Sequence, residues 1–210
     1  MRKRCEVDMR MRNPKYMNDE INNCEFLLTN KLFDNSNPIC MEVGMGKGDF
    51  LLNMAINNPN INYIGVEKYS SVASVAIHKI KEYELSNIKI FIGDILNIPE
   101  YVFHKIDIIY LNFSDPWPRK RHAKRRLTHE SFLTFYNNLF KNKCHIIMKT
   151  DNDDLYEFSK ESFINFGYKI NKDIKDLHKE NIFNIETEYE KKFSSLGFTI
   201  KYLDVEKDNL

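Results

Sequence analysis

The sequence has few cysteines, and they form no recognisable metal-binding or disulfide pattern. Its four cysteines, Cys5, Cys24, Cys40 and Cys144, lie far apart in the chain and form no C-x-x-C pair. A disulfide framework and a zinc site are therefore not expected, and we expect no bound metal. Unpaired cysteines also favour a reducing compartment, so we expect a cytoplasmic protein.

Long hydrophobic runs are also absent. No apolar run approaches the roughly 18 residues of a membrane-spanning helix, and the basic N-terminus has no apolar core after it, as a signal peptide would. Hydrophobic residues make up 42% and charged residues 29% of the 210 residues, which is typical of a globular protein. We expect a mobile basic arm over residues 1–16 and a single domain over 17–210, either as a monomer or as a homodimer.

Short runs rich in Ile and Val alternate with longer amphipathic stretches. Strands are expected over 39–43, 61–66, 88–92, 106–111, 144–148, 168–174 and 198–205. Helices are expected over 47–58, 70–85, 128–140, 151–166 and 188–196, with a further short helix after the N-terminal arm. Nearly continuous apolar strands that alternate with helices indicate an α/β fold. The expected architecture is an open, mostly parallel sheet of about seven strands with helices on both faces.

A glycine-rich turn follows the first expected strand. Residues 41–48 read MEVGMGKG, with glycines at Gly44, Gly46 and Gly48. Glycines at this point let the backbone turn tightly and approach a ligand closely. A plain connection between a strand and a helix would also explain them.

Acidic residues stand at or near the ends of three successive strands: Glu42, Glu67 and Asp94. Ligands of open α/β sheets bind beyond the carboxyl ends of the strands, where an acid can accept hydrogen bonds from ribose hydroxyls. Each acid taken singly also fits a surface residue or a helix cap. A nicotinamide or flavin cofactor competes here with S-adenosylmethionine. Glu42 favours the second, because a carboxylate attracts a cationic methionine group and repels a pyrophosphate.

The fourth strand leads into the segment NFSDPWP, residues 112–118. Its two prolines stiffen the backbone and remove two N–H donors, so Asp115 is expected on a rigid platform. A carboxylate there can accept hydrogen bonds from the N–H groups of guanine, although an Asp before Pro is also a common turn former. Trp117 fits either a base-stacking residue or a core residue.

A basic run, RKRHAKRR, occupies residues 119–126 directly after this platform. It holds six Lys or Arg residues and no acid; 31 basic residues minus these six leaves 25 against 30 acidic ones. The positive charge is therefore local. Beside a cofactor cleft, the run predicts a phosphate clamp that positions a polynucleotide.

Two further segments fit either a structural or a functional role. Asp151 follows the fifth strand, where it can cap the next helix or contact a substrate. Thr187 and Glu190 have the spacing of a capping box, and Gly197 stands where that short helix should end.

Taken together, these segments resemble the bacterial tRNA (guanine-N7)-methyltransferases. The resemblance extends from about Met41 to Gly197, and its most specific part is the stretch NFSDPWPRKRHAKRRL at 112–127. It implies the Rossmann-like fold of S-adenosylmethionine-dependent methyltransferases. It further implies transfer of a methyl group from S-adenosylmethionine to N7 of a guanine in tRNA, in the variable loop.

The resemblance also assigns residue roles. It implies that Asp115 is catalytic and that the cofactor is bound by Glu42, Gly44, Gly46, Gly48, Glu67, Asp94 and Asp115. It implies substrate and tRNA contacts from Arg119, Arg121, His122, Lys124, Arg125, Arg126, Asp151, Thr187, Glu188, Tyr189 and Glu190. Arg119 stands where the family usually has Lys, so a planar fork replaces a point charge.

Two other functions stay open. An NAD-dependent oxidoreductase would share the glycine turn and Glu67, but it leaves the basic run unexplained. A non-catalytic RNA-binding module would explain the basic run, but not the three acids at the strand ends.

Overall fold

The computed structural model describes residues 13–208, so Cys5 and most of the expected N-terminal arm lie outside the described residues. The chain divides into two compact units, Met1–Tyr101 and Val102–Leu210. The first unit contains the glycine turn and the three acids at the strand ends. The second contains the NFSDPWP segment and the basic run.

Three parallel strands form the sheet of the first unit, in the order β3-β2-β1. They are β1 (Ile39–Val43), β2 (Asn62–Glu67) and β3 (Ile88–Ile92). Every residue of β1 and β2 is buried, as in a parallel sheet that is covered on both faces. The parallel register aligns the carboxyl ends of the strands, because Val43 pairs with Val66 and Glu67 pairs with Ile92.

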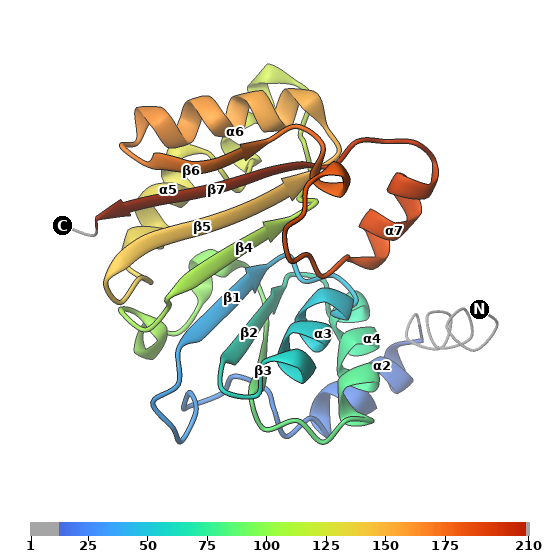
Figure 1. Ribbon diagram of the computed structural model, residues 1–210. Coiled ribbons are helices and arrows are strands. Elements are labelled where there is room, and N and C mark those ends of the chain that lie inside the picture. Colours follow the sequence, from blue (N-terminus) through green and yellow to red (C-terminus); the bar gives the residue numbers. More distant parts are fainter. Residues whose placement is uncertain (1–12, 209–210) are drawn as a thin grey trace. The chain divides into compact units, whose positions relative to one another are not determined.

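Helices α2 (Pro14–Asn22), α3 (Asp49–Asn57) and α4 (Ser70–Lys81) belong to the same unit (Figure 1). Helix α2 begins within the stretch expected to be a mobile arm. Asn13 explains this early start, because its side chain accepts a hydrogen bond from the Lys15 N–H and Pro14 is well placed in a first turn. Glu20 of α2 fastens this helix to α4 through His78 and Lys81, each at 3.0 Å.

The second unit has four strands in the order β4-β5-β7-β6. They are β4 (Ile108–Asn112), β5 (Lys143–Thr150), β6 (Lys169–Ile174) and β7 (Lys201–Asp208). Strands β4 and β5 are parallel, whereas β7 runs antiparallel to both β5 and β6. The helices of this unit are α5 (Glu130–Asn137), α6 (Asp153–Asn165) and α7 (Glu188–Ser195). Figure 1 shows α7 beyond the ends of β4 and β5.

Short 3₁₀ helices complete the two units. They are η1 (Ile95–Asn97), η2 (Glu100–Val102), η3 (Lys120–Arg125) and η4 (Leu177–Lys179). Most of the basic run therefore forms a 3₁₀ helix, a feature that the sequence pattern did not predict.

The expected pattern of seven mostly parallel strands is confirmed, with differences at the ends of elements. Helix α3 begins two residues later than expected, after the left-handed Gly48. Strand β7 is shifted three residues toward the C-terminus, and helix α4 ends at Lys81 rather than at residue 85. The N-cap of α6 is Asn152, whose side chain accepts a hydrogen bond from the Leu155 N–H at 2.8 Å, so the first of the two roles considered for Asp151, the helix cap, is wrong.

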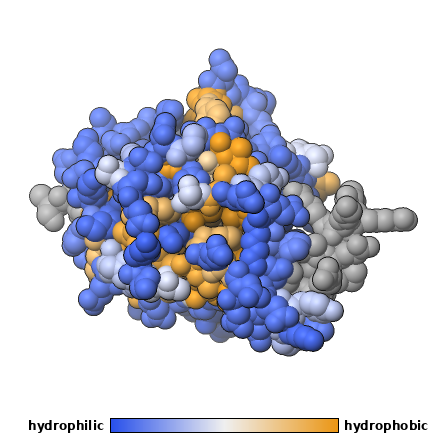
Figure 2. All heavy atoms as spheres, turned by 90° about the horizontal axis from the view of Figure 1, so that it is seen from below, coloured by the Kyte–Doolittle hydropathy of each residue, from blue (hydrophilic) through white to orange (hydrophobic). Residues whose placement is uncertain are grey.

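Hydrophilic residues predominate on the face drawn in Figure 2, and hydrophobic residues gather near its middle. Among residues 13–208, no helix combines the length and the hydrophobicity needed to cross a bilayer.

Asn87 fastens the end of α3 to the start of β3, and this contact gives a test of the fold. Its buried amide nitrogen lies 3.0 Å from the Ala55 carbonyl and 3.0 Å from the Ile61 carbonyl. We expect Asn87→Ala to lower the free energy of unfolding by about 1–3 kcal/mol, because buried carbonyls lose their donor. Urea unfolding of the full chain measures this change.

Asn97→Ala is the matched control, because Asn97 is exposed in the same unit. It should change the free energy of unfolding by less than about 0.5 kcal/mol. Equal effects of the two substitutions would contradict the assigned role of Asn87.

Candidate functional site

The glycine turn between β1 and α3 adopts the left-handed backbone that its sequence predicts. Gly44 has φ +82° and Gly46 has φ +57°, and a Cβ atom on either would meet nothing within 4 Å. A Cβ on Gly48, in contrast, would lie 2.9 Å from the Cβ of Ala76. The first two glycines therefore leave open space at the strand end, and the third allows α3 to approach α4 closely.

Glu67 ends β2 beside this turn and is only 7% exposed. One carboxylate oxygen accepts a hydrogen bond from the Gly46 N–H at 3.1 Å, and the other accepts from the Tyr69 N–H at 2.9 Å. Two backbone donors thus fix the direction of the carboxylate. Each oxygen keeps acceptor capacity for a further hydrogen bond, so Glu67 can also bind hydroxyl groups of a ligand.

Glu42 and Asp94 lie on the strands to either side of β2. Glu42 is 2% exposed on β1 and pairs in register with Gly65. Asp94 follows β3, and the Gly93 N–H donates to the Glu67 backbone carbonyl at 2.9 Å. The structure therefore gathers the three acids of the first unit at the carboxyl edge of neighbouring strands, as expected.

Asp94 is more exposed than the other two acids, and it also caps a helix. Its side chain accepts from the Leu96 N–H at 3.1 Å and pairs with Lys68 at 3.0 Å. Burial by itself raises the pKa of Asp94, but these two donors outweigh burial and lower the pKa below its ordinary value. Asp94 is therefore an anionic hydrogen-bond acceptor at neutral pH.

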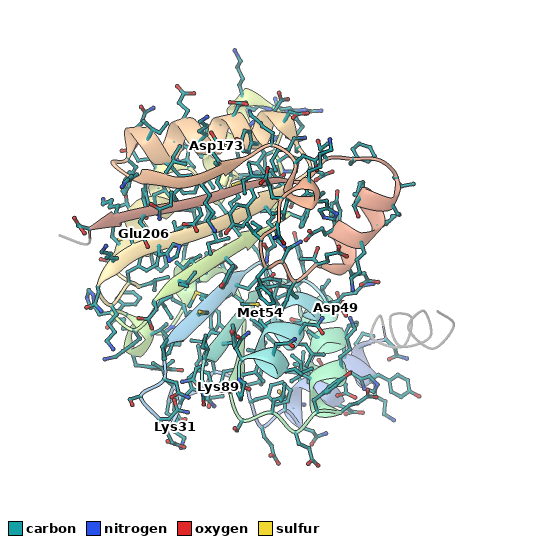
Figure 3. The ribbon with its side chains drawn as sticks, in the orientation of Figure 1. Lys31, Asp49, Met54, Lys89, Asp173 and Glu206 are labelled. Carbon is teal, nitrogen blue, oxygen red and sulfur yellow. The ribbon has the colours of Figure 1, made fainter. Side chains whose placement is uncertain are left out.

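An ion pair that the sequence pattern did not predict supports the glycine turn. Asp49, labelled in Figure 3 at the start of α3, pairs with Lys79 of α4 at 2.7 Å. Lys79 also donates to the Lys47 carbonyl within the turn at 3.1 Å. Both side chains of the pair are largely buried, so this contact fixes the position of α3 after the turn. The partners are 30 residues apart, and no local pattern connects them.

In the second unit, Asp115 is exposed on a backbone that turns sharply on either side of it. Phe113 has φ +52° and Trp117 has φ +42°. Left-handed conformations cost of order 1–3 kcal/mol at residues other than glycine, and they persist where surrounding contacts hold them. The Phe113 N–H donates to the Lys149 carbonyl of β5 at 2.8 Å. Between these residues, the buried Ser114 hydroxyl has no hydrogen-bond partner among residues 13–208.

The basic run does not present all its charges to solvent. Arg119, Lys120, Arg121, Lys124 and Arg125 are exposed, whereas Arg126 is 8% exposed. Arg126 instead donates to the backbone carbonyls of Pro116 and Trp117, at 2.9 and 3.2 Å. The tRNA contact that the resemblance implies for Arg126 therefore does not fit its surroundings.

Trp117, which precedes the basic run, lies beside two of its members. The Arg125 guanidinium is 4.8 Å from its ring centroid, and the His122 ring packs against its edge at 5.8 Å. Trp117 is therefore partly exposed among basic side chains rather than a core residue.

A buried ion pair joins α7 to the end of β5. Glu190 is fully buried, and its carboxylate accepts from the Lys149 ammonium at 2.7 Å. The Asn184 amide and the His178 ring complete the network, at 2.6 and 2.9 Å from the other carboxylate oxygen. Thr187 and Glu190 also form the expected capping box. Glu190 therefore supports the structure, and its contacts leave little access for a substrate.

Two residues between Thr187 and Glu190 are exposed instead of buried. Glu188 and Tyr189 are exposed, and the Tyr189 ring stacks on Phe193 with a centroid distance of 4.0 Å. Tyr189 also packs against Phe113, at 5.0 Å. Burial raises the pKa of the Tyr189 hydroxyl, and the neighbouring Asp151 raises it further. Asp151 and Tyr189 thus lie together near the end of β4, close to the segment that holds Asp115.

Within residues 13–208 no cluster of three or more His, Cys, Asp or Glu side chains could hold a metal ion. Cys24, Cys40 and Cys144 form no disulfide bond.

Several solved structures of methyltransferases are similar to this chain. The 16S rRNA methyltransferase KamB matches with a TM-score of 0.62 at 12% identity, covering 85% of this chain and 95% of its own. An antibiotic-related methyltransferase matches with a TM-score of 0.59 at 20% identity, covering 84% and 88%. These likenesses define the fold as the Rossmann-like fold of S-adenosylmethionine-dependent methyltransferases.

Sequence comparison identifies the family. Residues 36–203 match the family described as "Putative methyltransferase". A relative from Lachnoclostridium phytofermentans is 47% identical over 82% of both chains, and one from Bacillus subtilis is 46% identical over 84% of both. A relative from Mycoplasmopsis pulmonis is 40% identical over 93% of this chain and 98% of its own. All three are named tRNA (guanine-N7)-methyltransferase, and this chain belongs to that family.

The Lys149–Glu190 pair gives a stability prediction. Removing one charge of a buried pair leaves the other charge buried without its partner. Glu190→Gln should therefore lower the free energy of unfolding by about 3–5 kcal/mol at pH 7. Urea unfolding measures the loss. Glu188→Gln, an exposed substitution in the same helix, serves as the control and should cost under about 0.5 kcal/mol.

The same variant has a distinctive pH dependence. Burial raises the pKa of Glu190, but Lys149 and the other donors outweigh it, so the pKa lies below its ordinary value of 4.5. Glu190 therefore stabilises the fold above that value, and its contribution disappears as the pH falls through the lower folded pKa. The stability difference between wild type and Glu190→Gln should shrink over this acidic range. A constant difference would show that the carboxylate charge is not what stabilises α7.

Proposed function

We propose that this chain transfers a methyl group from S-adenosylmethionine to N7 of a guanine in tRNA. The relatives named for this reaction support the proposal at 40–47% identity. The geometric observation that carries it is the anionic edge formed by Glu42, Glu67 and Asp94 around the open glycine turn. The family match spans both compact units, which supports one methyltransferase domain over residues 17–210. We also propose a cytoplasmic location, where its tRNA substrate would be met.

The residues of the first unit suit this cofactor. There is space for a ligand in front of Gly44 and Gly46, and Glu67 would accept hydrogen bonds from its ribose hydroxyls. Asp94 would accept hydrogen bonds from other groups of the nucleoside, and Glu42 would attract the cationic methionine end. When bound, S-adenosylmethionine supplies a methyl group on a positively charged sulfur.

The reaction needs no proton removed, because guanine N7 has a free lone pair. We expect Asp115 to accept hydrogen bonds from the ring N–H and the amino group of the guanine, which would fix the orientation of N7. Orientation of this kind can contribute up to about 7–11 kcal/mol. The Asp115 carboxylate would also stabilise the positive charge that the guanine ring gains when N7 is methylated.

The exposed side of the basic run binds the tRNA backbone. Phosphates of the polynucleotide are bound by four exposed residues, Arg119, Arg121, Lys124 and Arg125. His122 packs against the edge of Trp117. Extrusion of the target guanine from its stack costs a few kcal/mol, which these contacts offset. Asp151 and Tyr189, which lie together near the end of β4, then contact the extruded nucleotide.

Replacement of one atom in the tRNA tests the proposed acceptor. We expect methyl transfer from labelled S-adenosylmethionine to an unmodified tRNA transcript, and none to a transcript in which 7-deazaguanosine replaces guanosine. The deaza base keeps its Watson–Crick edge but has a carbon in place of N7. Equal labelling of the two transcripts would contradict N7 as the acceptor.

Asp115→Asn tests the proposed catalytic group. The amide keeps the size of the side chain but loses its charge, so we expect kcat to fall about 10²–10³-fold. Calorimetry with S-adenosylmethionine measures cofactor binding separately, because the resemblance also places Asp115 among the cofactor-binding residues. Near-normal turnover in this variant would remove Asp115 from the mechanism.

A further inference from the structure

Arg126 differs from every other basic residue of the run in its surroundings. It ends a run whose other Lys and Arg residues are all exposed, yet its own side chain is buried. From the sequence alone, all these basic residues have the same expected role, which is contact with phosphates. The structure separates Arg126 from them by its contacts.

Two protein carbonyls occupy the Arg126 guanidinium. Nε donates to the Pro116 carbonyl at 2.9 Å, and one terminal nitrogen donates to the Trp117 carbonyl at 3.2 Å. Adjacent carbonyls suit the planar fork of an arginine, which a lysine cannot reproduce. A phosphate contact through these nitrogens would require both hydrogen bonds to break.

Helix α6 fixes the guanidinium in place. The Phe158 ring lies 4.3 Å from it, and such a contact is stronger where water is excluded. Two residues farther along the chain, the Thr128 hydroxyl bonds to the Ser159 hydroxyl at 2.7 Å, and the Thr128 carbonyl accepts from Ser162 at 2.6 Å. Arg126 therefore connects α6 to the loop that contains Asp115.

That loop needs to be held. Asp115 lies between two residues with left-handed backbone, Phe113 and Trp117. Strand β5 restrains the first through its Lys149 carbonyl, and Arg126 restrains the second through the Trp117 carbonyl. We propose that Arg126 is a positioning residue that fixes the loop presenting Asp115, and that it is not a phosphate contact. This inference rests on the proposed function, since it assigns Arg126 a role in the same reaction.

A pair of variants with equal loss of charge tests the proposal. Arg126→Gln should lower kcat about 10–100-fold, with tRNA affinity and its salt dependence within about twofold of the wild type. Arg121→Gln, the matched control at an exposed position, should instead weaken tRNA binding. Its slope of log affinity against log salt should become shallower by about 0.7–0.9.

Trp117 supplies a second readout that is independent of catalysis. It is the only tryptophan of the chain, so its fluorescence emission and acrylamide quenching report the loop directly. Both should change in Arg126→Gln and stay unchanged in Arg121→Gln. Arg126→Lys, which keeps the charge but not the fork, should restore neither kcat nor the emission spectrum.

Loss of folding must be separated from loss of positioning. Circular dichroism establishes that each variant is folded at the assay temperature. If Arg126→Gln does not fold, Phe158→Leu removes the ring that packs on the guanidinium and should shift Trp117 emission and lower kcat in the same direction.

The proposal is overturned if Arg126→Gln, or Phe158→Leu in its place, leaves Trp117 emission unchanged. It is equally overturned if Arg126→Gln reduces tRNA affinity and the salt slope as Arg121→Gln does. Failure of the wild type to methylate tRNA would contradict the proposed function, whereas the emission measurement would still decide the placement of Arg126.

Discussion

The hydrogen bond from the Gly46 N–H to the Glu67 carboxylate is the contact on which the first unit depends. It joins the turn after β1 to the end of β2, and its donor, Gly46, has a left-handed backbone. A side chain at Gly44 or Gly46 would strain the turn and fill the space in front of it. One contact therefore sets both the direction of a buried carboxylate and the opening beside it.

The basic side chains of the second unit have two different roles. Exposed members of the basic run can bind a polyanion, whereas Lys149 and Arg126 are buried and form their contacts with other groups of the protein. Lys149 fastens α7 to β5 through Glu190, and Arg126 fastens the Asp115 loop to α6. Charge count alone would overestimate the surface available to nucleic acid. Burial decides which positive charges bind a partner and which support the site.

Sequence patterns predicted the elements well where local chemistry determines them. Strands β1 and β3 match their expected bounds because each is a compact run of apolar residues bordered by polar ones. The capping box of α7 was equally visible, since Thr187 and Glu190 are three residues apart. Asp151 and Asn152 are both good caps, however, and the choice between them depends on backbone geometry that composition does not reveal.

The contacts that the sequence could not predict join residues far apart in the chain. Asp49 and Lys79 are 30 residues apart, and Lys149 and Glu190 are 41 residues apart. Nothing in the run RKRHAKRR marks its last arginine as buried, because that depends on the packing of α6. Expectations drawn from the resemblance alone therefore needed the structure to separate supporting residues from those that can meet a substrate.

Nucleoside analysis of tRNA after reaction tests the central claim most directly. The full chain is incubated with methyl-labelled S-adenosylmethionine and bulk tRNA, and the digested nucleosides are separated. The account predicts that the label appears in 7-methylguanosine. Label in a different nucleoside, or no label in tRNA at all, would contradict it.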